Sequence, residues 1–575
     1  MKKLLLFLSA FVIQHAEAQT INGEFLDINN INARFNADGS FFNDYGTSLT
    51  QEFEVPKGSG HHTFYAGGLW LGGFDAGSAL KLAAQTYHQY GTDYWPGPLN
   101  ATANTDSATI YNYNRVWKLN KCDIDTYLNW FNGGQIGPNP TDSTAMNTIM
   151  NWPAFSPFGF PLAPFTDVNS NGLYEPASGD YPLIKGDQSL FFVFNDRGGV
   201  HTETGGSPIG LEIQGMAYAY ACPADSLLSN TIFTYYKVFN RGVFSLDSVF
   251  VENWSDLDIG NAGDDFIGCD VTRGAYYGFN ADSVDNGLGG QLTYGSNPPA
   301  QAVVFLRGPR AELNGVDDSA SVTPNGTNYG DGIVDNERLG MSRFIYYKND
   351  GSPMGNPAVP LDYYNYMTGY WKDGSSLTYG GTGYMTGVNA QFMFPGTSDP
   401  MGFGTGMVPQ PAWDEFTSAN IPGDRRGMGA YGPFILQPGS SRDMDFAYVY
   451  ARATSGGNLA SVSLMKERID SLRQRFSTGI TACGCASSTG IASLSKDELV
   501  TVYPNPASNN ITLHFASAPK TTAIRIYDGM GRLVKFIENS GKNDIFIDIS
   551  GLSKGLYTID IQSDKNNSSA RFIKQ

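Results

Sequence analysis

The strongest constraint on the fold of this chain is the recurrence of short apolar runs that are interrupted by Gly, Asn and Asp. Residues of the β-branched and aromatic kind fit a pleated strand, whereas Gly, Asn and Asp favour turns. With 68 Gly and 13% aromatic residues among 575, the chain is expected to form a mainly β, sandwich-like body with long Gly- and Tyr-rich loops. The clearest runs are 189–195, 232–239, 248–254, 302–306, 344–347 and 446–451.

One segment follows a helical period instead. Its apolar residues recur three or four positions apart, which places them on one face of an α-helix. We therefore expect one amphipathic helix near 457–477, at the end of the body. The sequence does not decide whether this body is one sandwich or two packed units, but its length favours more than one unit. The residues with the helical period are Leu459, Val462, Met465, Ile469, Leu472 and Phe476.

The N-terminus has the order of a signal peptide. Lys2 and Lys3 precede the apolar run 4–13, and the small residues Ala16 and Ala18 follow it. Ten apolar residues are too few to span the ~30 Å of hydrocarbon in a bilayer. We expect the segment 1–18 to direct Sec export to the periplasm and to be removed, which leaves no transmembrane helix in the mature chain.

The C-terminus is expected to form a separate unit. Residues 479–496 are small and polar, which is typical of a linker. Beyond them, runs with a two-residue apolar period favour a small antiparallel β-sandwich over 497–575. The alternating residues are Ile511, Leu513, Phe515, Ile524, Ile526, Ile545, Ile547, Ile549, Tyr557, Ile559 and Ile561.

Several motifs in this unit are those of a known family. The strings VYPNPASNNITL, IYDGMGRLV, IDISGLSKGLYTIDI and RFIKQ occur in this order up to the last residue. Together they resemble the C-terminal sorting domain of the Bacteroidota type IX secretion system. The matching residues are Tyr503, Pro504, Asn505, Pro506, Gly531, Arg532, Leu552, Gly555, Tyr557 and Lys574.

The resemblance implies an immunoglobulin-like β-sandwich and export across the outer membrane by the type IX secretion machinery. It also implies removal of the domain by a sorting peptidase, followed by release or by attachment to surface lipopolysaccharide. We therefore expect a secreted or outer-surface protein. The resemblance covers only the C-terminal unit and implies nothing about the activity of the body, 19–478.

The acidity of the chain belongs to this body. The net charge is −18, whereas the segment 497–575 holds nine Lys and Arg against eight Asp and Glu. A nucleic-acid-binding protein needs a basic surface that neutralises phosphates. Nucleic acid is therefore not expected as a partner.

An oxygen-rich loop begins at Asp167. Asp167, Asn169 and Asn171 stand at positions one, three and five, and Gly172 at position six permits the sharp turn of a calcium loop. The alternative is an Asn- and Asp-rich turn that is held by its own side-chain hydrogen bonds. Further calcium ligands are expected from Glu175, Asp180 or Asp187.

Five carboxylates lie close together further along the chain. Carboxylates at such spacing repel one another unless a cation or hydrogen-bond donors neutralise them. Calcium binding is the first interpretation, a solvated acidic loop the second, and catalytic carboxylates the third. A glycosidase would need two carboxyl groups ~5–9 Å apart across a sugar cleft. The five residues are Asp256, Asp258, Asp264, Asp265 and Asp270.

No catalytic motif is recognisable, since the chain has no HExxH, no GxSxG and no legible Cys–His pairing. The basic residues of the run Asp424-Arg425-Arg426 are expected to form buried or interface ion pairs, with a substrate clamp as the alternative. Five Cys permit disulfides in an exported protein, but the sequence does not determine their pairing.

Two aromatic loops are candidates for ligand binding, because exposed rings stack on sugar faces and anchor protein interfaces. The alternative is that these rings fill the core of a Gly-rich protein. The candidates for stacking are Tyr94, Trp95, Tyr370 and Trp371.

The leading hypothesis is a non-enzymatic, calcium-stabilised protein that acts at the cell surface in adhesion, in a matrix, or in binding a glycan or protein ligand. The alternative is a secreted hydrolase that degrades polysaccharide or peptide. Acidic residues that converge in a closed oxygen cage favour the first. A carboxylate pair that faces an aromatic-lined cleft favours the second.

Deletion of the segment 498–575 should leave the protein inside the cell, because the sorting domain carries the export signal. Immunoblotting of cell, outer-surface and medium fractions measures this, with the full-length chain as the control. Normal export of the shortened chain would contradict the assignment.

Overall fold

The computed structural model describes residues 20–44, 50–89, 91–136, 138–287, 292–484, 500–515, 522–528, 532–539, 542–563 and 567–575. The chain divides into two compact units, one that ends at Ala486 and one that begins at Ser487. The expected signal peptide and most of the expected linker lie outside the described residues. Strands dominate both units, which confirms the mainly β fold class. In the described part of the chain, no helix is both long and apolar enough to cross a membrane.

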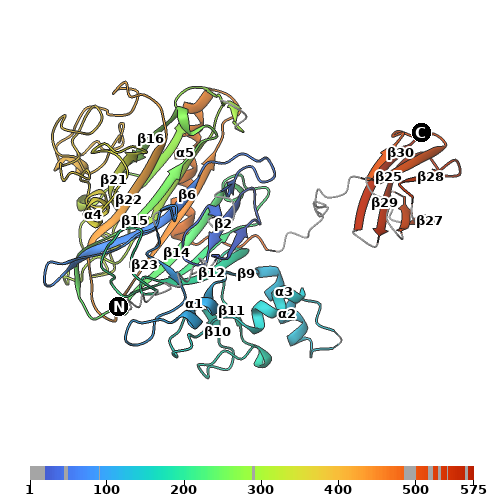
Figure 1. Cartoon of the computed structure of the whole chain (residues 1–575), viewed down its shortest axis with the longest axis horizontal. Helices are drawn as coiled ribbons and strands as arrows, with labels where there is room; N and C mark the ends of the chain where they lie inside the picture. The colour runs from blue at the N-terminus through green and yellow to red at the C-terminus, as the bar shows by residue number, and fades with distance from the viewer. Residues whose placement is uncertain are drawn as a thin grey trace, which may run out of the picture. The chain divides into compact units, whose positions relative to one another are not determined.

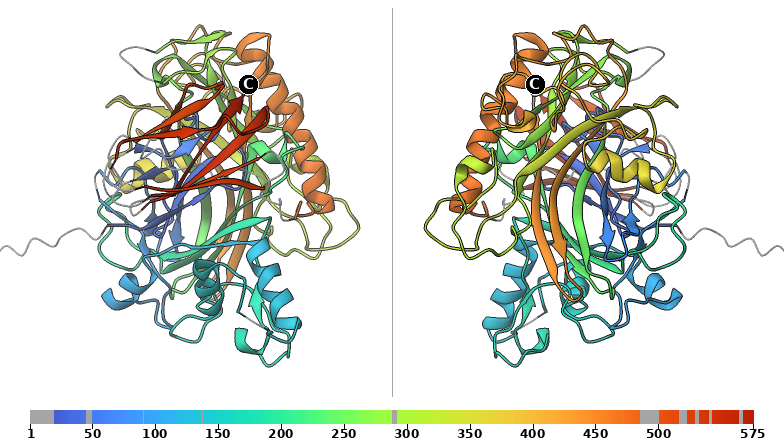
Figure 2. Two further views of the ribbon diagram at one scale, coloured as in Figure 1. Left: turned by 90° about the vertical axis from the view of Figure 1, so that its right-hand side faces the viewer. Right: turned by 90° about the vertical axis from the view of Figure 1, so that its left-hand side faces the viewer.

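Two antiparallel sheets form the body and pack face to face (Figure 1, Figure 2). All six runs predicted from the sequence are strands in these sheets. The nine-stranded sheet has the order β16 (Asp265–Asp270), β17 (Ala275–Asn280), β20 (Ala300–Arg307), β23 (Ser441–Ala451), β14 (Thr231–Asn240), β13 (Leu211–Ala219), β12 (Gln188–Asn195) and β8 (Trp95–Pro96), with β9 (Trp117–Asn120) also paired to β12. The five-stranded sheet has the order β21 (Met341–Lys348), β22 (Arg425–Leu436), β15 (Leu246–Leu257), β6 (Ala66–Asp75) and β7 (Leu80–Ala83).

Short strands complete the described part of the body. They are β1 (Gly23–Leu26), β2 (Asn32–Asn36) and β5 (Phe53–Glu54) in one sheet, and the pairs β3 (Asn43–Asp44) with β4 (Thr50–Gln51), β10 (Phe165–Thr166) with β11 (Tyr181–Pro182), and β18 (Val284–Asp285) with β19 (Gly295–Ser296). The α-helices are α1 (Ser107–Tyr113), α2 (Lys121–Asn132), α3 (Ser143–Met150), α4 (Pro360–Met367) and α5 (Gly457–Thr478).

The core between the two sheets is aromatic and contains a few polar groups that are hydrogen-bonded. Asn253 on β15 donates from Nδ2 to the hydroxyl oxygen of Tyr448 on β23 (2.8 Å). Tyr276 on β17 donates its hydroxyl to the carbonyl of Asn253 (2.9 Å). The ring of Tyr276 also stacks on Phe344 of β21, with 5.1 Å between the centroids. Buried polar groups are tolerated when they are paired in this way.

Helices cover the outer faces of the sheets. The predicted amphipathic helix is confirmed as α5, which packs Met465, Ile469 and Leu472 against the nine-stranded sheet, whereas Leu459 in its first turn is exposed. Helices α2 and α3 cover another part of the same sheet. Helix α4 lies over the five-stranded sheet. The sequence did not indicate α4, because its aromatic residues, Tyr363, Tyr364 and Tyr366, favour strands by propensity.

The C-terminal unit has two antiparallel sheets, as its alternating sequence predicts. All of the alternating apolar residues named above are buried in one core, which confirms the small β-sandwich. One sheet comprises β24 (Val500–Tyr503), β25 (Asn510–Phe515) and β28 (Asp544–Asp548). The other has the order β27 (Leu533–Asn539), β26 (Thr522–Tyr527), β29 (Gly555–Ser563) and β30 (Asn567–Lys574).

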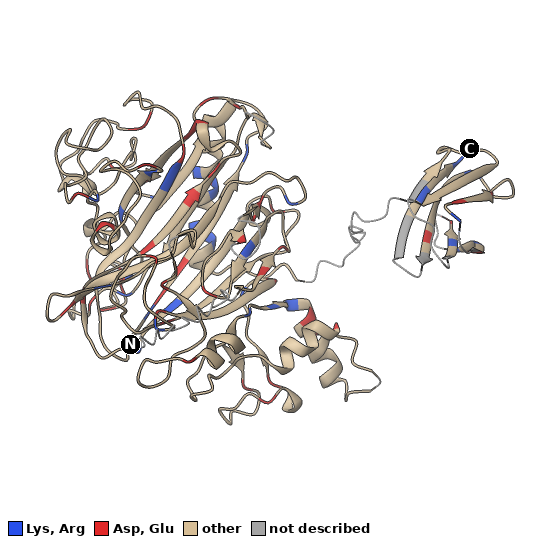
Figure 3. Ribbon diagram, viewed as in Figure 1, with Lys and Arg blue, Asp and Glu red and all other residues tan. Residues whose placement is uncertain are grey.

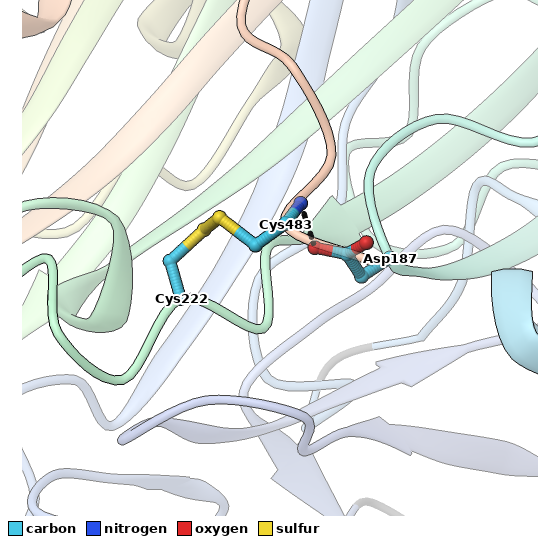
Figure 4. A group of neighbouring side chains, drawn as sticks. All are labelled: Asp187, Cys222 and Cys483. Atoms are coloured by element: carbon cyan, nitrogen blue, oxygen red, sulfur yellow. Dashed lines mark hydrogen bonds between the residues drawn. A yellow bond between two sulfur atoms is a disulfide. The ribbon is translucent and has the colours of Figure 1, made fainter. Parts of the chain in front are cut away.

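A disulfide anchors the end of the body. Cys483, which follows α5, is bonded to Cys222 in the connection between β13 and β14 (Figure 4). Asp187 supports the same segment, because its carboxylate accepts the amides of Cys483 (3.0 Å) and Gly484 (3.0 Å). Cys122 is also disulfide-bonded, and Cys269 is a buried free thiol.

Replacement of Cys222 by Ala should lower the free energy of unfolding by about 2–4 kcal/mol, because the bridge constrains two positions that are 261 residues apart in the unfolded chain. Thermal or denaturant unfolding of the non-reduced full chain measures the change. The double variant Cys222→Ala/Cys483→Ala is the control and should lose no more stability than either single variant. An unchanged midpoint would mean that the bridge contributes nothing to stability.

Candidate functional site

A cavity of about 230 Å³ lies at one edge of the five-stranded sheet. Neighbouring antiparallel strands run in opposite directions, so the end of β15 and the beginnings of β6 and β22 meet at this edge. The register pairs Asp256 of β15 with Arg426 of β22 on one side and with Ala66 of β6 on the other. Asp258 follows β15 directly, and Asp424 precedes β22.

Three carboxylates converge in this cavity around one basic residue. Asp256, Asp258 and Asp424 each place a carboxylate oxygen within 4.8 Å of the others. The guanidinium of Arg426 contacts both Asp256 (Nη2 to Oδ2, 3.2 Å) and Asp424. Tyr87 connects the group, because it accepts from Nε of Arg426 (2.7 Å) and donates to Oδ2 of Asp256 (2.5 Å). We call the cavity that these five residues line the acidic pocket.

Burial makes the negative charges of the acidic pocket costly. Asp256 is only 2% exposed, and burial raises the pKa of its carboxyl to about 6, although Arg426 opposes the shift. Burial, together with the neighbouring carboxylates Asp256 and Asp424, raises the pKa of Asp258 well above its ordinary value. With all three carboxylates ionised and Arg426 protonated, the cluster carries an excess of two negative charges.

The donor set of the acidic pocket fits a hard divalent cation. Oδ1 of Asp256 is buried and has no hydrogen-bond partner in the described part of the chain, whereas Oδ2 of Asp258 accepts from Gln51 (3.0 Å). Calcium takes six to eight oxygen ligands and prefers carboxylates among them. An orphaned, buried carboxylate oxygen beside two further carboxylates is the kind of group that such an ion satisfies.

The structure divides the five-carboxylate cluster that the sequence predicted. Asp256 and Asp258 lie in the acidic pocket, but β16 carries Asp265 and Asp270 away into the other sheet. Oδ2 of Asp265 accepts the amide of Ile259 (2.8 Å). Asp270 pairs with Arg273 (2.9 Å) and lies 3.7 Å from Lys466. Asp264 lies in the half-buried turn before β16 and accepts the amide of Asn286 at 3.4 Å. These five residues therefore do not form one common site.

The loop that begins at Asp167 holds its predicted ligands together by hydrogen bonds. The carboxylate of Asp167 accepts the amides of Asn171 (3.2 Å) and Gly172 (2.7 Å). The carboxylate of Asp180 accepts the amides of Val168 (2.9 Å) and Glu175 (2.8 Å). Asn169 also accepts the amide of Asn171, and the side chain of Asn171 donates to Glu175. Calcium in this loop stays a prediction.

Two of the aromatic candidates are corrected by their burial. Tyr94 is 2% exposed and donates to the carbonyl of Ala83, and Trp371 is fully buried and donates to the carbonyl of Gly383. Neither ring offers a face to a ligand, because a Gly-rich body with few aliphatic residues fills its core with aromatic ones. Tyr370 is 43% exposed, and Trp95 is half-buried near His201. The rings at the acidic pocket are instead Tyr65, Tyr87, Tyr347 and Tyr363.

Tyr87, Asp424 and Arg426 are the residues of the acidic pocket that the sequence pattern did not bring together with Asp256 and Asp258. The run Asp424-Arg425-Arg426 was expected to form ion pairs, and this is confirmed, since Arg425 pairs with Glu415 (3.1 Å) and Arg426 with Asp256. Acidic and basic residues lie on the central strands of the body (Figure 3). The charged run itself is visible in the sequence, but it does not indicate that β15 is the strand with which Arg426 pairs.

The sorting-domain motif occupies structural positions in the C-terminal unit. The turn Pro504-Asn505-Pro506 follows Tyr503 at the end of β24, and Asn505 bonds to β30 through the carbonyl of Arg571 (3.0 Å) and the amide of Ile573 (3.0 Å). Tyr557 stacks on Phe572, Leu552 packs against the core, and Arg532 pairs with Asp528 (2.8 Å). Gly555 begins β29 and Lys574 ends β30. Gly531 lies outside the described residues.

The family model for the secretion system C-terminal sorting domain matches residues 501–575. This confirms the type IX sorting domain that the C-terminal motifs resemble. The protein is therefore directed to the type IX secretion machinery and is secreted to the cell surface or the extracellular space. No curated protein matches the chain.

The solved structures that are similar to parts of the chain include an immunoglobulin-like protein and a polysaccharide lyase. One is a DUF3244 family protein from Bacteroides vulgatus with an immunoglobulin-like β-sandwich fold, at 24% identity over 13% of this chain and 84% of that chain, with a TM-score of 0.12. The other is a polysaccharide lyase, at 10% identity over 72% of this chain, with a TM-score of 0.19. The match spans 40% of the lyase. At these TM-scores, neither likeness bears on the function of the body.

Glu203 should make stability depend on pH. It is 5% exposed, and burial raises its pKa to about 7 from 4.5, although Thr86 donates to it. The folded state thus holds this proton more tightly than the unfolded state, so stability falls as the pH rises from 4.5 to 7. Glu203→Gln should stabilise the protein by up to about 3 kcal/mol at pH 8 and leave it unchanged at pH 4.

Denaturant unfolding of the full chain at the two pH values measures this difference. Glu467→Gln, at an exposed position on α5, is the matched control and should have no effect at either pH. Equal effects of Glu203→Gln at both pH values would show that the side chain acts through packing and not through its charge.

Proposed function

We propose that the body is a binding module that the sorting domain delivers to the cell surface, and that its acidic pocket holds a calcium ion. The observation that carries the proposal is the convergence of Asp256, Asp258 and Asp424 on a single Arg, with Oδ1 of Asp256 buried and unpaired in the described chain. A divalent cation balances the excess of two negative charges. Calcium fits better than a softer metal, because all of the charged donors are carboxylate oxygens.

The proposed ion would also connect separate parts of the body. Asp256 and Asp258 stand at the end of β15, whereas Asp424 stands far along the chain, immediately before β22. A cation shared by these residues would crosslink the two strands at this end of the sheet. A cation that binds only the folded state stabilises it by mass action. The calcium-stabilised protein expected from the sequence would therefore have its ion here.

A secreted hydrolase is the second candidate, and two observations favour it. Asp256 has a pKa of about 6, which suits a general acid, and a second carboxylate lies within 4.8 Å. It ranks second because Asp256 is held by both Arg426 and Tyr87, whereas a general acid must be free to protonate its substrate. Hydrolysis of an extracellular polysaccharide by the parent chain, and its loss in Asp256→Asn, would support this candidate.

Processing at the surface completes the proposal. A sorting peptidase would remove the C-terminal unit, and the body would then be released or attached to surface lipopolysaccharide. The disulfide and Asp187 would keep the end of the body anchored after such a cut, because both hold residues 483 and 484 to the core. The ligand of the displayed body would be an extracellular glycan or protein.

Calcium should bind the full chain, and Asp258→Asn should weaken this binding by about 100-fold. In the calcium-free state the same variant should be at least as stable as the parent, because it removes a buried charge that burial disfavours. Isothermal titration with calcium and thermal unfolding with calcium or chelator measure both effects. A saturated site should add about 3 kcal/mol of stability at a calcium concentration 100-fold above Kd.

The matched control is Asp167→Asn, which removes the same charge from the other predicted calcium loop. Loss of calcium binding in Asp167→Asn but not in Asp258→Asn would move the ion to that loop. Absence of calcium binding by the parent chain would refute a calcium-dependent function at either place.

A further inference from the structure

The acidic pocket is lined by uncharged groups apart from its three carboxylates and Arg426. Most of these groups are tyrosine rings and side-chain amides, and Thr86 and Pro357 complete the lining. Tyrosine rings offer flat apolar faces, and amides both donate and accept hydrogen bonds. The residues that matter here are Tyr65, Gln89, Asn349 and Asn356.

Charge balance limits the class of ligand that can join a calcium ion in this cavity. With all three carboxylates ionised, the cluster of Asp256, Asp258, Asp424 and Arg426 has an excess of two negative charges, which one calcium ion cancels. The loaded site would then attract neither an anionic nor a cationic ligand by charge. Calcium takes six to eight oxygens, so coordination positions beyond the three carboxylates remain for neutral oxygens.

We propose that the calcium-loaded acidic pocket binds a neutral sugar, with two neighbouring hydroxyls of one ring completing the coordination of the ion. This inference rests on the proposed function, and it names the ligand class of the same site. Vicinal hydroxyls supply two neutral oxygens at a spacing that one ion can accept. The remaining hydroxyls would bond to the amides, and the apolar face of the ring would lie against tyrosine.

The amides are placed for such contacts. Nδ2 of Asn356 donates to Oδ1 of Asn349 (2.9 Å) and so orients the Asn349 amide. The NH₂ group of Asn349 makes no hydrogen bond to the described residues and could donate to a ligand. The side chain of Gln89 is exposed and makes no hydrogen bond to the described residues. Tyr65 is half-buried beside the carboxylates and packs edge-on against Tyr87 at 5.8 Å.

The size of the cavity favours a single ring. Sites for drug-sized ligands measure about 300–1,000 Å³, whereas this cavity measures about 230 Å³. A terminal sugar of a glycan fits this description better than an internal segment of a polysaccharide chain does. The site would thus recognise glycan ends, which suits a surface binding module.

The test measures binding of the full chain to a broad array of neutral glycans, with calcium and with chelator. Methyl α-mannoside and methyl β-galactoside serve as soluble competitors, and glucuronate and glucosamine serve as charged ones. We expect the chain to bind neutral glycans only when calcium is present. The neutral methyl glycosides should inhibit this binding more strongly than the charged sugars do. The double variant Gln89→Ala/Asn349→Ala should weaken glycan binding by about tenfold or more, because it loses hydrogen bonds to hydroxyls, and it should bind calcium as the parent does.

Gln410→Ala, at a half-buried amide outside the pocket lining, is the matched control and should change neither affinity. Calcium binding without binding to any neutral glycan on the array would overturn this inference and leave the proposed function intact. Stronger inhibition by glucuronate than by the neutral methyl glycosides would also overturn it. So would glycan binding that chelator does not reduce. Failure to bind calcium would instead refute the proposed function.

Discussion

Strand β15 is the element on which the architecture of the body depends, because its two faces meet different layers. The alternation of a strand sends Asn253 into the space between the sheets, where it bonds to Tyr448, and sends Trp254 and Asp256 to the opposite face. Trp254 stacks on Trp70 of the neighbouring strand β6 there. Because β22 and β6 flank β15 on both sides, the edge that holds the acidic pocket belongs to a rigid sheet, which keeps its carboxylates in place.

The acidic pocket differs from the other predicted acidic sites in how its charge is balanced. Asp270 is met by two basic side chains, and Asp167 and Asp180 are met by backbone amides of their own loop. In the acidic pocket, Arg426 pairs with Asp256 and Asp424, and one buried oxygen of Asp256 has no hydrogen-bond partner in the described part of the chain. Burial of an excess charge is costly, so the calcium ion is proposed for this cluster and not for the self-bonded loops.

The sorting domain and the acidic pocket lie in separate units of the chain. The sorting domain lies within the second compact unit, and every residue that lines the acidic pocket lies in the first. The disulfide between Cys222 and Cys483 closes the first unit just before the chain leaves it.

Local periodicity determined much of the fold. The alternation of Ile545, Ile547 and Ile549 and the helical spacing of Met465 and Ile469 depend only on neighbouring residues, so they predict a buried strand face and a buried helix face without the rest of the chain. The sorting motif is equally local.

The site depends on pairing that no local pattern contains. Asp256 meets Arg426 and Asp424 because β15 and β22 are neighbours in one register, and Asp270 leaves the cluster because β16 joins the other sheet. The sequence alone therefore determined the long strands of the body, helix α5 and the sorting domain. Only the tertiary structure decided which carboxylates share a cavity, because strand order and register are set by packing between distant segments.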